Sequence, residues 1–246
     1  MNLTFNNIKK TKSNLNYPSQ LFINGKYQKS ISEKSFENIS PIDGSIVNQV
    51  FFAEQEDIDL AVSKAKETFN KGYWSNLSPG ERKKILLKFA ILLERDRLEL
   101  SLLDTIDMGK TINDTYNADL PTSIDNIEWY AEIIDKLFDD ISPSSKEYLG
   151  LITKEPIGVV AAIVPWNYPL WMAIWKIAPA LITGNSVILK PAEQSPMSAI
   201  KIGALLSEAG VPDGVFSVLP GDGPITGKSL CLHNDIDCVA FTGSGE

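Results

Sequence analysis

The sequence predicts an α/β protein built on a doubly wound, Rossmann-like parallel sheet that is incomplete. Residues 158–164, 186–189, 215–219 and 238–241 are short, mainly apolar runs, as expected of buried strands. Helix-like segments alternate with these runs, and strands connected in this way pair in parallel through right-handed crossovers. An N-terminal helical region precedes the half-sheet, and a protruding segment is expected between the two.

Composition places the chain among globular proteins and excludes some partners. It has 246 residues, 43% hydrophobic and 22% charged. The net charge is -8 and no block of Lys or Arg occurs, so no nucleic-acid partner is expected. Pro165 and Pro169 interrupt the uncharged stretch 157–175, which argues against a membrane span. Two cysteines suit a reducing compartment, and a cytoplasmic location is expected.

The first elements are an arm and two turns. Residues 1–20, rich in Asn and Lys, are expected to form a flexible arm. Asn24-Gly25 predicts a hairpin, because this pair tolerates the positive φ of a type I′ turn. Pro41 to Gly44 is a second turn signal. These turns open the region 21–137, which is expected to be the N-terminal part of a cofactor-binding domain.

Helices are expected in the rest of that region. Ser78 and Glu81 form a capping box around Pro79 and open one helix. Gly109 ends another helix, and a further one is expected over 122–137. Apolar side chains at helical spacing support the first two helices: Ile58, Ala61, Val62, Ala65 and Phe69, then Ile85, Leu86, Phe89, Leu92 and Leu93.

Residues 138–157 differ from both flanking regions. A Ser/Pro-rich loop begins at Ser142, and 148–153 has the pattern of an exposed strand. An extended segment that leaves its domain can pair with a neighbour's sheet. We therefore expect 138–157 to be an oligomerisation strand and 158–246 to be the Rossmann-like half-sheet.

Four loops follow the predicted strands, at 165–169, 190–196, 221–223 and 241–246. The carboxyl ends of parallel strands lie along one sheet edge, so these loops predict a cofactor crevice. The prolines of the first loop hold Asn167 beyond a strand end, where its amide can donate to an oxyanion. The alternative is an asparagine that only caps its own backbone.

Taken in order, the motifs resemble the N-terminal half of NAD(P)-dependent aldehyde dehydrogenases. The resemblance runs from about residue 21 to the end and rests on Ile163–Pro169, Gly184–Glu193 and Phe241–Ser244. Three further stretches are similar to the γ-glutamyl-γ-aminobutyraldehyde and betaine-aldehyde branch: Trp129–Ala131, Lys154–Gly158 and His233–Asp237.

The resemblance implies roles for individual residues. Asn167 matches the oxyanion donor, and Trp166 matches a position lining the cofactor phosphates, although a core aromatic is the alternative. Lys190 and Glu193 match positions that hold the adenosine ribose, although such a pair is often only solvated surface. A carboxylate there would repel a 2′-phosphate, so NAD is expected as the cofactor and NADP is less favoured. Ser244 matches a pyrophosphate contact near the next helix.

The other residues implied to bind the cofactor lie on or beside the same loops: Ile163, Pro165, Gly223, Gly227, Phe241, Thr242 and Gly243. No metal site is predicted. Trp171 and Trp175 either line an aldehyde tunnel, where aromatic rings favour cationic amino-aldehydes, or pack in the core.

The family's nucleophilic cysteine and general-base glutamate have no match in this sequence, and Glu246 comes too early to be that glutamate. Cys231 and Cys238 are expected to be buried and inert, and His233 to lie on the surface. The sequence is therefore expected to be a fragment. The complete enzyme would oxidise a small-molecule aldehyde to an acid through a cysteine thiohemiacetal and thioester, as a homodimer or homotetramer. The alternative is a catalytically inactive nucleotide-binding or interaction module.

Overall fold

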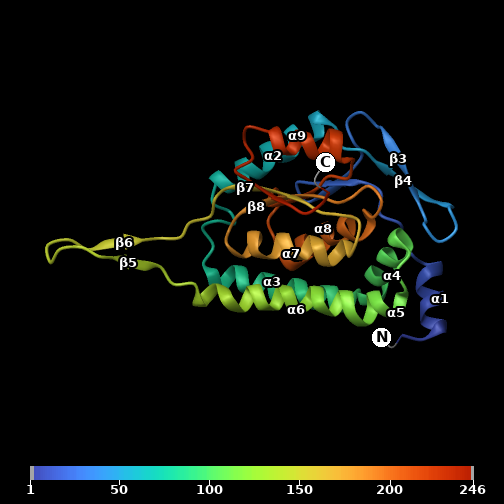
Figure 1. The fold of residues 1–246 in the computed structure, drawn as a ribbon, viewed down its shortest axis with the longest axis horizontal. Helices are drawn as coiled ribbons and strands as arrows, with labels where there is room; N and C mark the ends of the chain where they lie inside the picture. The colour runs from blue at the N-terminus through green and yellow to red at the C-terminus, as the bar shows by residue number, and fades with distance from the viewer. Residues whose placement is uncertain (1–2, 245–246) are drawn as a thin grey trace.

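The computed structural model describes residues 3–244 and has a six-stranded sheet at its centre, in the order β10-β7-β8-β9-β1-β2 (Figure 1). Four of these strands are parallel, as the sequence predicts: β7 (Val159–Ile163), β8 (Ser186–Lys190), β9 (Phe216–Val218) and β10 (Cys238–Phe241). Strand β7 is buried on both faces. Val159 and Ala161 contact one core cluster, and Val160 and Ala162 the other. This explains why the strand sequences are continuously apolar.

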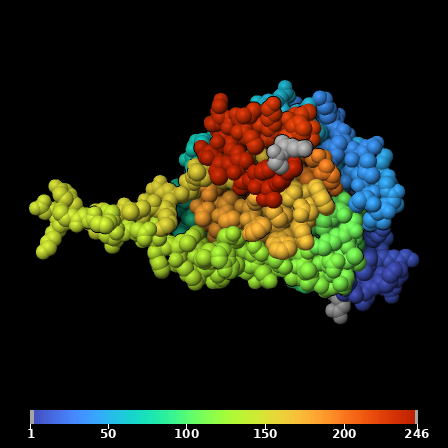
Figure 2. All heavy atoms as spheres, in the orientation of Figure 1, coloured from blue at the N-terminus to red at the C-terminus, as the bar shows by residue number. Residues whose placement is uncertain are grey.

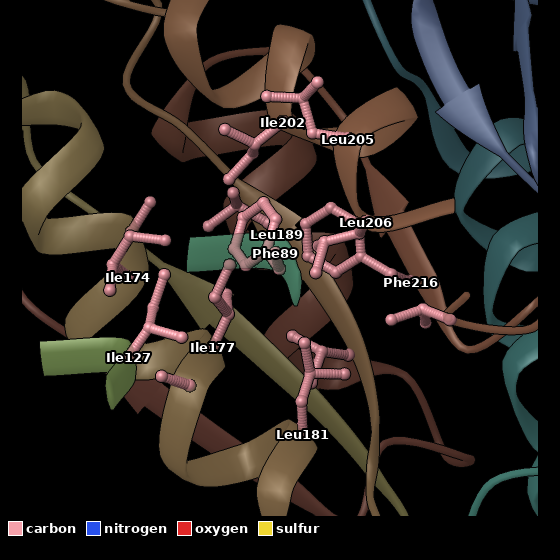
Figure 3. Close-up of a cluster of buried hydrophobic side chains, with 14 of the residues drawn as sticks. Phe89, Ile127, Ile174, Ile177, Leu181, Leu189, Ile202, Leu205, Leu206 and Phe216 are labelled. Carbon is pink, nitrogen blue, oxygen red and sulfur yellow. The ribbon is translucent and has the colours of Figure 1, made fainter. Parts of the chain in front are cut away.

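Helices cover both faces of the sheet (Figure 1). One face carries α7 (Pro169–Ile182) and α8 (Met197–Ala209), with α3 (Pro79–Arg95) and α6 (Leu120–Ile133) packed outside them. The other face carries α2 (Gln55–Asn70) and α9 (Lys228–Leu232). Figure 3 shows side chains of α3, α6, α7 and α8 meeting above strand β8. These layers are those of a doubly wound fold.

The N-terminal hairpin extends the central sheet, which the sequence did not indicate. Strands β1 (Leu21–Ile23) and β2 (Lys26–Gln28) pair antiparallel, and Phe22 of β1 pairs with Val218 of β9. The hairpin itself was predicted correctly, since Asn24 and Gly25 have φ of 51° and 77°. The second turn joins β3 (Ser35–Ile39) to β4 (Ile46–Phe51) in a separate two-stranded sheet.

The structure has a helix in the middle of residues 1–20, for which the sequence predicts a flexible arm. Residues Phe5–Ser13 form helix α1, which begins with the Asn7 N–H donating to Thr4 Oγ1 at 3.3 Å. Ile8 packs against Leu98 and Leu102 of α4 (Arg97–Met108). The apolar face of α1 is narrow and lies among many Asn and Lys residues. The periodicity that indicates a helix was therefore hidden.

Four short helical segments complete the helices of residues 3–244. They are α5 (Ile112–Asp114), the π-helical η1 (Thr115–Asp119), the 3₁₀-helical η2 (Ile134–Lys136) and the π-helical η3 (Gly223–Gly227). The helix expected over 122–137 corresponds to α6 and η2 together. Within residues 3–244, no helix has both the length and the apolar character needed to cross a membrane.

The segment between the two regions is a hairpin that projects from the body of the protein (Figures 1 and 2). Strands β5 (Asp140–Ser142) and β6 (Gly150–Ile152) pair antiparallel, so there are two strands where the sequence indicated one. Large apolar side chains on and beside this hairpin are exposed: Phe138, Ile141, Leu149, Leu151, Ile152 and Ile157. This hairpin therefore has an apolar surface that its own fold leaves uncovered.

Arg82 on α3 closes the carboxyl end of α7. Its residue exposure is 7%, and its Nε donates to Ile182 O at 2.8 Å. Its Nη1 donates to the carbonyls of Ser75 and Leu77. The guanidinium thus meets three carbonyl groups, one of which belongs to the last turn of α7, where a cation also complements the helix dipole.

We expect Arg82→Met to lower the free energy of unfolding by about 3 kcal/mol, because buried carbonyls lose charged donors. Urea denaturation followed by circular dichroism measures the change. Lys88→Met is the matched control, since Lys88 Nζ on the same helix donates to Glu208 O at 2.7 Å from an exposed position. Equal losses in the two variants would contradict the assignment.

Candidate functional site

Three strands of the central sheet end in register. Ile163 at the end of β7 pairs with Lys190 at the end of β8 and with Phe241 at the end of β10. Strand β9 follows β8, with Val218 paired to Leu189. The four predicted loops therefore leave the sheet at one edge, which confirms the geometric part of the prediction.

The loop after β7 is tied to its two neighbours. The Trp166 carbonyl accepts from Ser195 Oγ at 3.0 Å, which links it to the loop after β8. On the other side, the Thr242 N–H donates to Ile163 O at 3.1 Å. Pro165 is half-buried, whereas the Trp166 residue is 56% exposed. Trp166 is therefore not a core aromatic, and the alternative given for it is wrong.

Asn167 is exposed at the tip of this loop. Between residues 3 and 244 its side-chain amide has no hydrogen-bond partner, so it does not cap its own backbone. The next residue, Tyr168, has a positive φ of 53°, and its carbonyl accepts from the Met172 N–H at 2.8 Å as α7 begins. The loop thus presents an amide donor with its hydrogen-bonding capacity unused.

Lys190 and Glu193 lie together after β8. Lys190 is only 3% exposed, and its Nζ is 3.5 Å from Glu193 Oε2. Burial lowers the pKa of the Lys190 ammonium, and the carboxylates of Glu193 and Asp222 oppose that change. Glu193 is the single hydrogen-bond partner of this ammonium in the described part of the chain. An ammonium carries three donors, so Lys190 has donors left for a ligand.

The loop after β9 turns into η3. Asp222 Oδ1 accepts from the Ile225 N–H at 2.7 Å and caps this short helix. Gly223 is exposed at its start, whereas Gly227 is buried at its end. A side chain at Gly221 would place its Cβ 1.9 Å from Thr226 Oγ1, so the turn requires glycine there.

The loop after β10 is the last part that the structure describes. Phe241, Gly243 and Ser244 are exposed and Thr242 is half-buried. A Cβ on Gly243 would lie 2.6 Å from the Phe241 ring, so this close approach favours glycine. The helix expected after Ser244, and Glu246 itself, lie outside the described residues.

Two buried carboxylates behind these loops were missed by the sequence reasoning. The Leu170 N–H, at the start of α7, donates to Asp104 Oδ2 at 3.4 Å. The Met197 N–H, at the start of α8, donates to Asp107 Oδ2 at 2.8 Å. Burial raises the pKa of Asp104 to about 7 and that of Asp107 to about 8. The sequence does contain a signal for these carboxylates: two acidic residues lie three positions apart on the otherwise apolar face of helix α4.

The remaining candidates lie away from the site edge. Cys238 begins β10, opposite Val160, at the other end of the strand from Phe241. Cys231 on α9 is exposed, so the expectation that it is buried is wrong: the short helix turns it toward solvent. His233 Nε2 is 3.4 Å from Asp59 Oδ1, and the Asp235 N–H donates to its Nδ1.

Two tryptophans follow the Asn167 loop on α7. Trp171 is half-buried, and its ring meets that of Tyr168 edge to face at 5.3 Å. Trp175 is 54% exposed. Trp175 therefore does not pack in the core, and that alternative is wrong for it.

Comparison with known proteins agrees with this arrangement. Residues 27–246 match the family described as the aldehyde dehydrogenase family. The chain is 46% identical over 226 residues to the NADP/NAD-dependent aldehyde dehydrogenase PuuC of Escherichia coli, covering 92% of this chain and 46% of that protein. It is 41% identical over 230 residues to an aminoacetaldehyde dehydrogenase of Pseudomonas aeruginosa, with 94% and 46% covered.

Solved structures show the same likeness. The P. syringae indole-3-acetaldehyde dehydrogenase AldA, in complex with NAD+ and IAA, superposes with a TM-score of 0.96 at 48% identity, over 99% of this chain and 49% of that one. A γ-glutamyl-γ-aminobutyraldehyde dehydrogenase from Burkholderia cenocepacia gives 0.95 at 45% identity, over 98% and 49%. The chain spans about half the length of the curated relatives it matches. With its sheet-edge loops and its match over most of its length, the chain belongs to the aldehyde dehydrogenase family.

Proposed function

We propose that this chain supplies the cofactor-binding and oxyanion-holding part of an enzyme that oxidises an aldehyde to a carboxylic acid with NAD. The main support for this proposal is that one edge of the sheet holds two kinds of polar side-chain group. The Asn167 amide, which has no hydrogen-bond partner within residues 3–244, lies beyond the end of β7, and the buried Lys190 lies beside the more exposed Glu193 at the end of the neighbouring β8. The first suits a developing negative charge, and the second suits hydroxyl groups.

The chain's own groups fit NAD. Within residues 3–244 the Lys190 ammonium bonds only to Glu193, so it has donors for one ribose hydroxyl, and the Glu193 carboxylate can accept from the other hydroxyl. Trp166 lies exposed on the adjoining loop, and Ser244 on the loop after β10. Glu193 would repel a 2′-phosphate, which favours NAD over NADP. When bound, NAD supplies the hydride acceptor.

Asn167 does the catalytic work that this chain contributes. When a thiolate adds to the aldehyde carbonyl, the oxygen becomes an oxyanion, and the Asn167 amide donates a hydrogen bond to it. We propose that the thiolate and the general base that hydrolyses the thioester come from residues outside this sequence. Cys238 lies at the opposite end of its strand, and Cys231 is on α9.

For the substrate, we propose an aldehyde whose tail lies along α7. Trp175 is exposed there, and aromatic faces attract amine cations. The names of two relatives, a γ-glutamyl-γ-aminobutyraldehyde dehydrogenase and an aminoacetaldehyde dehydrogenase, refer to nitrogen-containing aldehydes.

Isothermal titration calorimetry tests the cofactor assignment. NAD and NADP are each titrated into the purified 246-residue chain, and the two affinities are compared. We expect Glu193→Gln to shift the ratio of the two affinities toward NADP by about tenfold, since one repulsive charge is removed. Glu147→Gln, an exposed carboxylate on the β5–β6 hairpin, is the control. A ratio that stays the same, or a wild-type chain that binds neither nucleotide, would contradict the assignment.

We also propose that the β5–β6 hairpin joins subunits into a homodimer or homotetramer. Its exposed apolar side chains and its free strand edges support this. Leu151→Lys is expected to lower the mass measured by light scattering, because it places a charge in the apolar surface. Lys146→Leu at the hairpin tip is the control. An unchanged mass in Leu151→Lys would count against this role.

A further inference from the structure

A lysine outside the cofactor loops lies against the loop that carries Asn167. The Lys110 Nζ is 4.1 Å from the centroid of the Tyr168 ring, which is cation–π geometry. The same ammonium is 2.7 Å and 2.6 Å from the two oxygens of Asp119. The Asp119 side chain is only 5% exposed and that of Lys110 is 25% exposed, so the ion pair is largely shielded from solvent.

The backbone on both sides explains why the pair forms here. Gly109, with φ of 73°, ends α4 and turns the chain at Lys110. Asp119 closes the π-helical turn η1, a type of irregularity that is frequent at functional sites. Ser123 Oγ donates to the Asp119 carbonyl at 2.7 Å, and Thr105 and Thr115 share a hydrogen bond of 3.0 Å between α4 and η1. Both partners are therefore held by the surrounding structure.

Tyr168 needs such support. Its φ of 53° is left-handed, a conformation that residues other than glycine rarely adopt and that persists where neighbours enforce it. The Lys110 ammonium lies over a face of the Tyr168 ring, and the Trp171 ring packs edge to face against it at an interplanar angle of 89°. Its carbonyl is held by the Met172 N–H. Because Tyr168 directly follows Asn167, a change in the Tyr168 backbone would redirect the Asn167 side chain.

We propose that Lys110 is a positioning residue for the oxidation. Its ammonium, held by Asp119, keeps Tyr168 in the left-handed conformation and thereby directs the Asn167 amide toward the oxyanion. This inference rests on the proposed function. Lys110 acts through its contacts with Asp119 and the Tyr168 ring.

The first test uses the 246-residue chain and needs no turnover. In ¹⁵N NMR spectra, Lys110→Met is expected to shift the side-chain amide resonances of Asn167, whereas Lys110→Arg, which keeps the charge, retains them. Lys201→Met is the matched control, because Lys201 forms a similar ion pair with Glu99 at 2.9 Å. Loss of Lys110 leaves Asp119 buried without its partner, so Lys110→Met with Asp119→Leu is the second variant if the single one does not fold.

The second test is steady-state kinetics of an enzyme that contains this chain, with the same substitutions. Lys110→Met is expected to lower kcat about 10-fold to 100-fold with little change in the KM for NAD, and Lys110→Arg to restore most of it. Unchanged Asn167 resonances in a folded variant, or an unchanged kcat, would overturn the inference. If the wild type oxidises no aldehyde but the resonances shift as expected, the proposed function fails, and what stands is that Lys110 positions the Asn167 side chain.

Discussion

Replacement of Asn167 by alanine is expected to lower the kcat of the proposed aldehyde oxidation by about 10²–10³-fold in an enzyme that contains this chain. This is the usual cost of removing one donor from an oxyanion site, because the donor acts when charge develops in the transition state. The Asn167 amide is exposed and makes no hydrogen bond to any residue between 3 and 244, so folding should change little. Absorbance of NADH at saturating aldehyde measures the effect.

Asn234→Ala is the matched control, since Asn234 is an exposed asparagine on a turn after α9. It should leave kcat unchanged. Binding of NAD to Asn167→Ala should also be near the wild-type value, because Lys190 and Glu193 lie on the next loop. A loss of less than about threefold in kcat would mean that another group stabilises the oxyanion.

Asp107→Asn is expected to remove part of the pH dependence of stability. Burial raises the pKa of Asp107 in the folded state to about 8, far above the ordinary value of 3.8 for an aspartate side chain. The folded protein thus keeps a proton that the unfolded chain has released. The stability due to this group is complete below about pH 4 and is lost as pH rises toward 8.

The side chain at residue 107 is uncharged at every pH in the asparagine variant, so the variant does not lose this contribution to stability. We expect its stability relative to the wild type to rise by on the order of 3 kcal/mol between about pH 5 and about pH 8.5. Urea denaturation at a series of pH values measures the difference. Asp235→Asn, at an exposed turn, is the control. Parallel curves for Asp107→Asn and the wild type would show that Asp107 is ionised in the folded protein.

The half-sheet was predictable because its signals are local. Each strand is a short apolar run, and each following helix has its own start or stop residue, such as Gly184 and Gly210. Parallel strands with helical crossovers leave one arrangement for the loops, so the shared edge followed directly. The register of Ile163 with Lys190 and Phe241 confirms that inference.

Other features depended on partners far away in the sequence. Strand β1 joins the sheet through Phe22 and Val218, and three residues contain too little pattern to indicate that pairing. Helix α1 is stabilised by contacts of Ile8 with α4 rather than by strong helix propensity. The ion pair of Lys110 with Asp119 needs a π-helical turn, which no periodicity predicts.

By itself the sequence determined the alternating strands and helices of the half-sheet, the family and the loop residues, because turn chemistry and apolar patterns depend on residues that are close together in the sequence. Only the tertiary structure decided which side chains are free and which are held. It showed that the Asn167 amide has no partner among the described residues, that Lys190 is buried beside Glu193, and that Asp104 and Asp107 are buried beneath two helix starts. Burial and hydrogen bonding arise from long-range packing, and these properties set the charge and the orientation of each side chain at the site.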